Sequence, residues 1–280
     1  MGAAFPPPSS PGTSGTSAPS SGTPLPPPPP SELTRPTAYA AYRPEPATTG
    51  TLSRVGGLGR WVTWLVGVAG AAGVLSAILL LPVVGTASDV IDGRADLSEF
   101  EDAYVPVQLV QTVQSVVGIA AGVITIVWMY RIASNLRAFA RDTTFAPFLS
   151  VFAWILPPFL YVLPFLVLRE LWTASDPTVE HGSDAWKNRK VSPLLSIWFV
   201  VYGLVPAVIT AVVAFDAVDS ILSNGIAGAG DPQVVAESLA STGMLTVVSG
   251  GLAAVAAITW IVFARRLTDR HMAMTGEEAA

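Results

Sequence analysis

Five stretches of this chain, each 25 to 28 residues long, contain no Asp, Glu, Lys or Arg. They cover residues 61–88, 103–130, 143–168, 191–215 and 238–264. About 20 consecutive apolar residues cross a bilayer core as a helix, and a soluble domain of this length would not leave half of its residues free of charge. The sequence therefore predicts an all-α integral membrane protein, in a chain of which only 12% is charged.

The third stretch differs from the others because prolines interrupt it. It contains Pro147, Pro157, Pro158 and Pro164. Proline removes a helix hydrogen bond and clashes with the preceding turn, which leaves pieces of roughly 10 to 14 residues, each about half a bilayer core in length. A Pro-broken re-entrant or interfacial segment at about 145–168 is therefore the alternative to a fifth span.

The basic residues favour four spans over five. With four spans, a re-entrant third stretch and a cytoplasmic N-terminus, 14 of the 15 Lys and Arg are cytoplasmic and only Arg94 is outside. With five spans, eight of these bases lie outside. Because basic residues concentrate in cytoplasmic loops, we expect four transmembrane helices and both termini on the cytoplasmic side of the cell membrane. The expected spans are 61–84, 105–128, 194–215 and 243–264.

Three regions follow from this pattern. Residues 1–50 hold 14 of the 24 prolines and too few apolar side chains to offset the entropy of ordering. They are expected to form a disordered, Pro-rich cytoplasmic tail. The transmembrane helical domain is expected over 51–270, and a short C-terminal tail over 271–280.

Polar side chains inside the predicted spans are few and uncharged. Gln108, Gln111 and Gln114 form a polar stripe along the second span, which either hydrogen-bonds a neighbouring helix or lines a polar cavity. Gly118 and Gly122 form a small-residue pair that permits close helix packing within the bundle or between copies. The absence of charge in the spans argues against an ion-coupled transporter.

No catalytic, cofactor-binding or metal-binding motif is apparent in the sequence. The chain has no cysteine and two histidines, His181 and His271. Scattered polar side chains such as Glu180, His181 and Asp184 are more typical of a solvated loop than of a metal site. We therefore expect no catalytic residue, no cofactor, no metal and no nucleic-acid partner.

Two short runs resemble a known family. The first, W-M-Y-R-I-A-S-N-L-R, ends the second span and includes Trp128, Arg131, Asn135 and Arg137. The second places Trp154, Pro157 and Pro164 before Arg169, Glu170 and Trp172. Both runs are similar to those of domain of unknown function 4328, a family of uncharacterised bacterial membrane proteins. The resemblance implies a location in a membrane. It does not indicate an activity.

The sequence supports two hypotheses about function. The first is a structural or interaction protein of the cytoplasmic membrane that contacts the lipid bilayer, another membrane protein or a second copy of itself. The second is a transporter, or a protein that binds a small molecule or lipid, with a cavity at the Pro-broken segment. Arg131 or Arg137 is expected either to pair with Glu170 or to meet anionic lipid headgroups.

Overall fold

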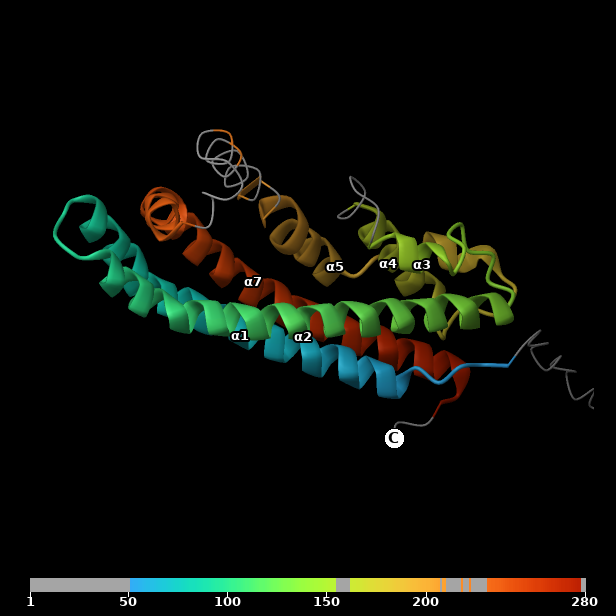
Figure 1. Ribbon diagram of the computed structural model, residues 1–280. Coiled ribbons are helices and arrows are strands. Elements are labelled where there is room, and N and C mark those ends of the chain that lie inside the picture. Colours follow the sequence, from blue (N-terminus) through green and yellow to red (C-terminus); the bar gives the residue numbers. More distant parts are fainter. Residues whose placement is uncertain are drawn as a thin grey trace, which may run out of the picture. The chain divides into compact units, whose positions relative to one another are not determined.

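A computed structural model describes residues 51–154, 162–206, 208–209, 218, 222 and 231–277 (Figure 1). All of them belong to the unit Pro46–Ala280, one of two into which the chain divides. Every regular element in these ranges is a helix, and none of the described residues forms a strand. The predicted tail over 1–50, Pro157 and most of the second half of the predicted span 194–215 lie outside the described residues.

Three helices are long and apolar enough to cross a membrane: α1 (Gly56–Ile91), α2 (Leu97–Ala138) and α7 (Pro232–Thr275). They contain the predicted spans 61–84, 105–128 and 243–264. Their 36, 42 and 44 residues extend about 54 to 66 Å at 1.5 Å per residue, roughly twice the thickness of a bilayer core. Each helix therefore continues beyond the apolar core, and α7 reaches Thr275, inside the segment expected to form the C-terminal tail.

Helix α1 packs against both α2 and α7 and runs antiparallel to each of them (Figure 1). Glycines bring α1 and α7 close together: a Cβ added to Gly70 would lie 2.7 Å from the Cβ of Ala257, and one added to Gly250 would lie 2.7 Å from that of Ala77. Small residues at such contacts allow the close packing on which helix association in membranes depends.

The outward faces of the long helices are apolar. On α2, exposed residues three or four positions apart form one stripe, made of Leu109, Val113, Val116, Ile119, Val123 and Val127. A contiguous exposed apolar surface of this kind suits contact with lipid tails rather than water. The expectation of a helical protein is confirmed, and three of its helices could span a membrane.

The Pro-rich third stretch contains two short helices, α3 (Leu149–Phe152) and α4 (Val162–Ala174). They have 4 and 13 residues, and neither is long enough to cross a bilayer core. Pro164 is buried in the first turn of α4 as described, where a missing N–H costs no helix hydrogen bond.

The start of the fourth predicted span is also helical. After the 3-10 helix η1 (Asp184–Asn188), the chain forms α5 (Pro193–Trp198) and continues as the π-helix η2 (Phe199–Leu204). Together Pro193–Leu204 make one apolar helix that is shorter than a bilayer crossing. It packs against α7.

The two ends of the bundle differ in charge. The acidic end holds the turn between α1 and α2 and the start of α7, with Arg94 paired to Asp89 at 2.6 Å and to Asp92 at 2.7 Å. The basic end is formed by residues 51–55 and the start of α1, the last turns of α2 and α7, and the described chain between α2 and α5. These segments carry every other described Lys and Arg, namely Arg54, Arg60, Arg131, Arg137, Arg141, Arg169, Lys187, Arg189, Lys190, Arg265, Arg266 and Arg270. The one base at the acidic end is therefore neutralised locally, whereas bases accumulate at the other.

Candidate functional site

A buried polar cluster joins four parts of the chain at the basic end. Asn135 of α2 binds the backbone of Ser53, since its Oδ1 accepts the Ser53 N–H at 2.8 Å and its Nδ2 donates to the Ser53 carbonyl at 2.8 Å. The same Nδ2 lies 3.1 Å from Nε2 of His271, whose Nδ1 lies 3.1 Å from Oγ of Ser175. Asn135 is 2% exposed, and Ser175 and His271 are fully buried, so these three side chains are closed to solvent, whereas Ser53 is an exposed residue.

The hydrogen bonds define the protonation state of His271. Because the Ser53 backbone sets the orientation of the Asn135 amide, an N–H of Asn135 faces Nε2, and Nε2 must accept it without a proton of its own. The proton then sits on Nδ1 and is donated to Ser175. A ring nitrogen that already carries a proton cannot remove one from the Ser175 hydroxyl. In this tautomer His271 donates to Ser175 and links Asn135 to it.

The first motif run fastens α2 to α7 and to the segment that precedes α1. Trp128 is fully buried, and its Nε1 donates to Oγ1 of Thr268 at 3.2 Å. Arg131 donates from Nη1 to the carbonyl of Arg54 at 3.1 Å. Arg137 is exposed at the end of α2 and makes no side-chain hydrogen bond or ion pair in the described part of the chain.

Glu170, in the second run, binds backbone rather than an arginine of the first run. Its carboxylate accepts the N–H of Thr144 at 2.6 Å and that of Phe145 at 3.0 Å. It forms no ion pair with a described residue, so of the two alternatives for Arg131 and Arg137, the pair with Glu170 is not formed. The backbone at the start of the third stretch has no helix to satisfy its N–H groups, and these donors occupy the carboxylate.

Trp172, at the end of the second run, links three segments. Its Nε1 donates to the carbonyl of Lys190 at 3.3 Å, and its ring stacks on Phe263 of α7 with centroids 5.5 Å apart. The guanidinium carbon of Arg270 lies 4.8 Å from the ring centroid. Aromatic and cation–π contacts of this kind contribute about 0.5–1.5 kcal/mol each, so the ring helps to hold α4 against α7.

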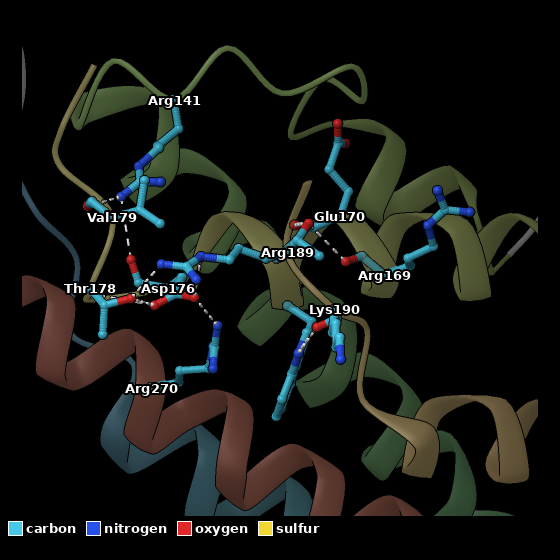
Figure 2. Close-up of polar contacts among 11 residues, drawn as sticks. Arg141, Arg169, Glu170, Asp176, Thr178, Val179, Arg189, Lys190 and Arg270 are labelled. Carbon is cyan, nitrogen blue, oxygen red and sulfur yellow. Dashed lines mark hydrogen bonds and ion pairs between the residues drawn. The ribbon is translucent and has the colours of Figure 1, made fainter. Parts of the chain in front are cut away.

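Asp176 is the electrostatic centre of the basic end (Figure 2). Its Oδ2 lies 2.8 Å from Nη2 of Arg270 and 3.3 Å from Nε of Arg189, and its Oδ1 accepts the N–H and Oγ1–H of Thr178 at 2.9 and 2.7 Å. Burial acts to raise the pKa of Asp176, but the Thr178 hydrogen bonds and the charges of both arginines outweigh it and hold the pKa below its ordinary value. The sequence run A-S-D-P contains this residue, but nothing in the run indicates its distant partners.

Arg141 is a buried cation beside Asp176 (Figure 2). It is 1% exposed, and its Nη2 donates to the carbonyls of Val179 at 2.6 Å and Asp176 at 3.4 Å. Its Nε and Nη1 have no hydrogen-bond partner within the described ranges. Burial lowers the pKa of Arg141, while the charge of Asp176 acts in the opposite direction. The Asp176 carboxylate thus offsets part of the cost of this buried charge.

The two motif runs lie in a region that matches a protein family. Residues 91–231, half of the chain, match the model of Domain of unknown function (DUF4328). The chain belongs to the DUF4328 family. The resemblance predicted from the two runs is confirmed. No curated protein and no solved structure matches the chain.

The DUF4328 region is tied to the helices on either side of it. The region holds α2, the broken segment and α5, whereas several partners of its motif residues lie outside, namely Ser53, Thr268, Arg270 and His271. The motif side chains therefore attach the family region to α1 and α7. Among the described residues, no group of three or more His, Cys, Asp or Glu side chains is arranged to hold a metal ion.

A cavity lies between α1, α2, α5 and α7 of this DUF4328 protein, within the predicted spans. Its volume is about 260 Å³. The walls combine small residues with aromatic rings, among them Gly70, Gly118, Gly122, Trp154, Trp198 and Trp260. Because Trp154 belongs to the third stretch, the cavity lies beside the Pro-broken segment.

The three glutamines of the predicted polar stripe lie in different surroundings. Gln114 lines it, Gln111 is half-buried and Gln108 is exposed. None of the three side chains hydrogen-bonds a neighbouring helix in the part of the chain that is described. Gly118 and Gly122 line the cavity and are exposed. A Cβ added to either would meet no atom within 4 Å, so this pair takes no part in close packing inside the bundle.

Proposed function

We propose that this protein binds an apolar molecule, such as the acyl chain of a lipid, in the cavity between α1, α2, α5 and α7. The observation that carries the proposal is the space itself, about 260 Å³ at the depth of the apolar core. Sites for small molecules are concave and mostly apolar, with a few polar groups. Of the two hypotheses from the sequence, the cavity favours a protein that binds a small molecule or lipid over a structural or interaction protein.

The chemistry of the walls selects an apolar occupant. Trp260 forms an aromatic wall with Trp198 and Trp154, whose ring centroids lie 4.9 and 6.3 Å from its own. The lining contains no charged side chain among the described residues. Atoms that border a void lack van der Waals partners on one side, so a hydrocarbon chain entering from the bilayer gains contacts that the empty cavity lacks.

Gln114 adds one polar contact to this lining. It packs against α1, where a Cβ on Gly73 would lie 3.0 Å from its Nε2. Its amide has no hydrogen-bond partner among the described residues. An unpaired amide in an apolar wall favours a ligand with one matching group, and an ester carbonyl or a hydroxyl at the head of an acyl chain fits this requirement.

Replacing Gly122 with Leu tests the cavity as a binding site. Since a Cβ at this position meets nothing within 4 Å, we expect α2 to accept the larger side chain while the cavity fills. The measurement is quenching of tryptophan fluorescence by lipids with brominated acyl chains. It is made with the exposed Trp61 and Trp64 replaced by Phe, since these rings are 62% and 70% exposed and meet bulk lipid. We expect Gly122→Leu to lose at least half of the quenching.

Gly251→Leu is the matched control. Gly251 is an exposed glycine of α7 at which a Cβ also meets nothing within 4 Å, and it does not line the cavity. Quenching should stay at the level of the unsubstituted protein. Equal quenching in all three proteins would contradict binding in the cavity and leave the structural or interaction role as the better hypothesis.

The helix directions support a second part of the proposal, four crossings of the cell membrane with both termini in the cytoplasm. Helix α2 ends at the basic end and α7 begins at the acidic end, which supports a further crossing of the chain between them. The apolar helix Pro193–Leu204, packed on α7, is suited to begin that return. The short α3 and α4 both pack on α2 at the basic end, which supports a segment that enters and leaves on one side. Concentrated bases mark that side as cytoplasmic.

Single cysteines in this cysteine-free chain test the orientation. Ser98 is exposed at the acidic end and Asn188 is exposed in η1 at the basic end. We expect a membrane-impermeant maleimide to label Ser98→Cys in intact cells and to label Asn188→Cys only after the membrane is permeabilised. Labelling of Asn188→Cys in intact cells would contradict the four-crossing topology.

A further inference from the structure

A second cavity lies at the basic end, between α4 and η1, and shares no residue with the first. Its volume is about 290 Å³. Three basic side chains line it, those of Arg169, Lys187 and Arg189, whereas Glu170 is the one acidic residue among its described lining residues. The walls are therefore rich in positive charge.

Arg169 is the base that lacks a partner. Lys187 pairs with Asp184 at 2.8 Å, and Arg189 pairs with Asp176 at 3.3 Å. Arg169 is exposed, and its guanidinium makes no ion pair or hydrogen bond with any described residue. A guanidinium presents five N–H donors in a planar fork that matches phosphate oxygens, so Arg169 is free to bind an anion.

Glu170, the acidic residue in the wall of the second cavity, already accepts two hydrogen bonds. The Glu170 carboxylate accepts the backbone N–H groups of Thr144 and Phe145, and it is directed away from Arg189 (Figure 2). These two donors occupy its oxygens and partly offset its charge. Glu170 therefore forms no ion pair with the described bases of the cavity, although its charge is one of the smaller causes that raise the pKa of Lys187.

Trp186 adds a buried donor with no acceptor. The residue lines the cavity and is 2% exposed, and its Nε1–H has no hydrogen-bond partner in the described part of the structure. Indole nitrogen can only donate, and buried polar groups in native proteins nearly always have a partner. An oxygen-rich anion in this cavity would supply the missing acceptor.

We propose that the second cavity binds a phosphate group, held by Arg169 and by the indole N–H of Trp186, with Lys187 and Arg189 adding positive charge. Arg169 directly follows Leu168, the last residue of the charge-free third stretch, which places the cavity at the level of lipid headgroups. A phospholipid headgroup and inorganic phosphate offer the same recognition chemistry. The site does not depend on the apolar cavity, because different residues line it.

Arg169→Gln and Trp186→Phe test this site in the full-length protein, purified in a maltoside detergent. The ligands are phosphatidylglycerol, inorganic phosphate and diacylglycerol, which has the same chains as the phospholipid but no phosphate. Binding is measured as the rise in melting temperature with ligand concentration and by native mass spectrometry. We expect each substitution to weaken phosphatidylglycerol binding about tenfold, since a hydrogen bond to a charged group is lost, and to leave any diacylglycerol binding unchanged.

The two phosphate ligands distinguish the source of the group. A response to both would support recognition of the phosphate alone, and a response to phosphatidylglycerol only would support a lipid headgroup. Arg266→Gln is the matched control, because Arg266 is an exposed base of the basic end that does not line the cavity. The proposal is overturned if Arg169→Gln and Trp186→Phe bind phosphatidylglycerol as tightly as the wild type. It is also overturned if Arg266→Gln weakens binding as much as Arg169→Gln. Because the Arg169 side chain has no hydrogen-bond or ion-pair partner among the described residues, the Arg169→Gln protein is expected to fold, and its binding measurement remains decisive.

Discussion

Replacing Asp176 with Asn is expected to destabilise the protein by about 3 kcal/mol, the low end of the cost of breaking a buried ion pair. The carboxylate is 9% exposed and pairs with Arg270, which is 25% exposed, and with Arg189, which is 46% exposed. Removing its charge also leaves the fully buried Arg141 without a nearby anion. The substitution keeps the shape of the side chain, so the loss measures charge rather than packing. Thermal unfolding of the purified protein in detergent reports it.

Asp184→Asn is the control for this prediction. Asp184 forms an ion pair of similar length with Lys187, but its side chain is 75% exposed, and exposed pairs contribute little. We expect its melting temperature to stay near that of the wild type. A similar decrease in melting temperature in both variants would contradict the prediction that the burial of Asp176 makes its ion pairs more stabilising than the exposed pair of Asp184.

Lowering the pH should reproduce part of the loss of stability that is expected for Asp176→Asn. The pKa of Asp176 is lowered from its ordinary value of 3.8 by hydrogen bonds and by the two arginines, which outweigh burial. A carboxyl group whose pKa is lower in the folded state stabilises the fold above its unfolded pKa and loses this contribution as the pH falls through the folded pKa. The stability difference between the wild type and Asp176→Asn should therefore be constant at neutral pH and shrink below about pH 3.8.

Replacing Asn135 with Leu is expected to cost about 2 to 4 kcal/mol, because each buried group left without a partner costs about 1–3 kcal/mol. Leu has a similar size but cannot bond the N–H and carbonyl of Ser53 or Nε2 of His271, which Asn135 contacts at 2.8, 2.8 and 3.1 Å. The segment before α1 should detach first, since Asn135 binds its backbone directly. Hydrogen exchange of the Ser53 amide and thermal unfolding in detergent together measure the loss.

Gln108→Leu is the matched control on the same helix. Gln108 is an exposed amide with no side-chain hydrogen bond to a described residue, so its replacement removes no buried contact. Surface substitutions of this kind change stability by about 0.5 kcal/mol or less. Faster exchange at Ser53 in both variants would contradict the role of Asn135 as the anchor of residues 51–55.

The two motif runs show which features could be predicted from the sequence and which could not. Their residue types predicted a family, and the family match confirms it. The partners were not predictable, because Asn135 binds Ser53 and His271, which lie far from it along the chain. Glu170 shows the same limit, since an ion pair with Arg131 or Arg137 was one of two alternatives from the sequence, whereas its carboxylate accepts two backbone N–H groups in the structure.

The charge-free stretches by themselves predicted a helical protein with segments long and apolar enough to cross a membrane, because the length and polarity of a segment are properties of the chain in one dimension. Three such helices are present in the described residues. The four prolines likewise marked the third stretch as broken. Only the tertiary structure decided which polar groups are buried together, where the glycines of α2 line a cavity and which bases have no partner among the described residues. Those features depend on distances between residues that the sequence does not place side by side.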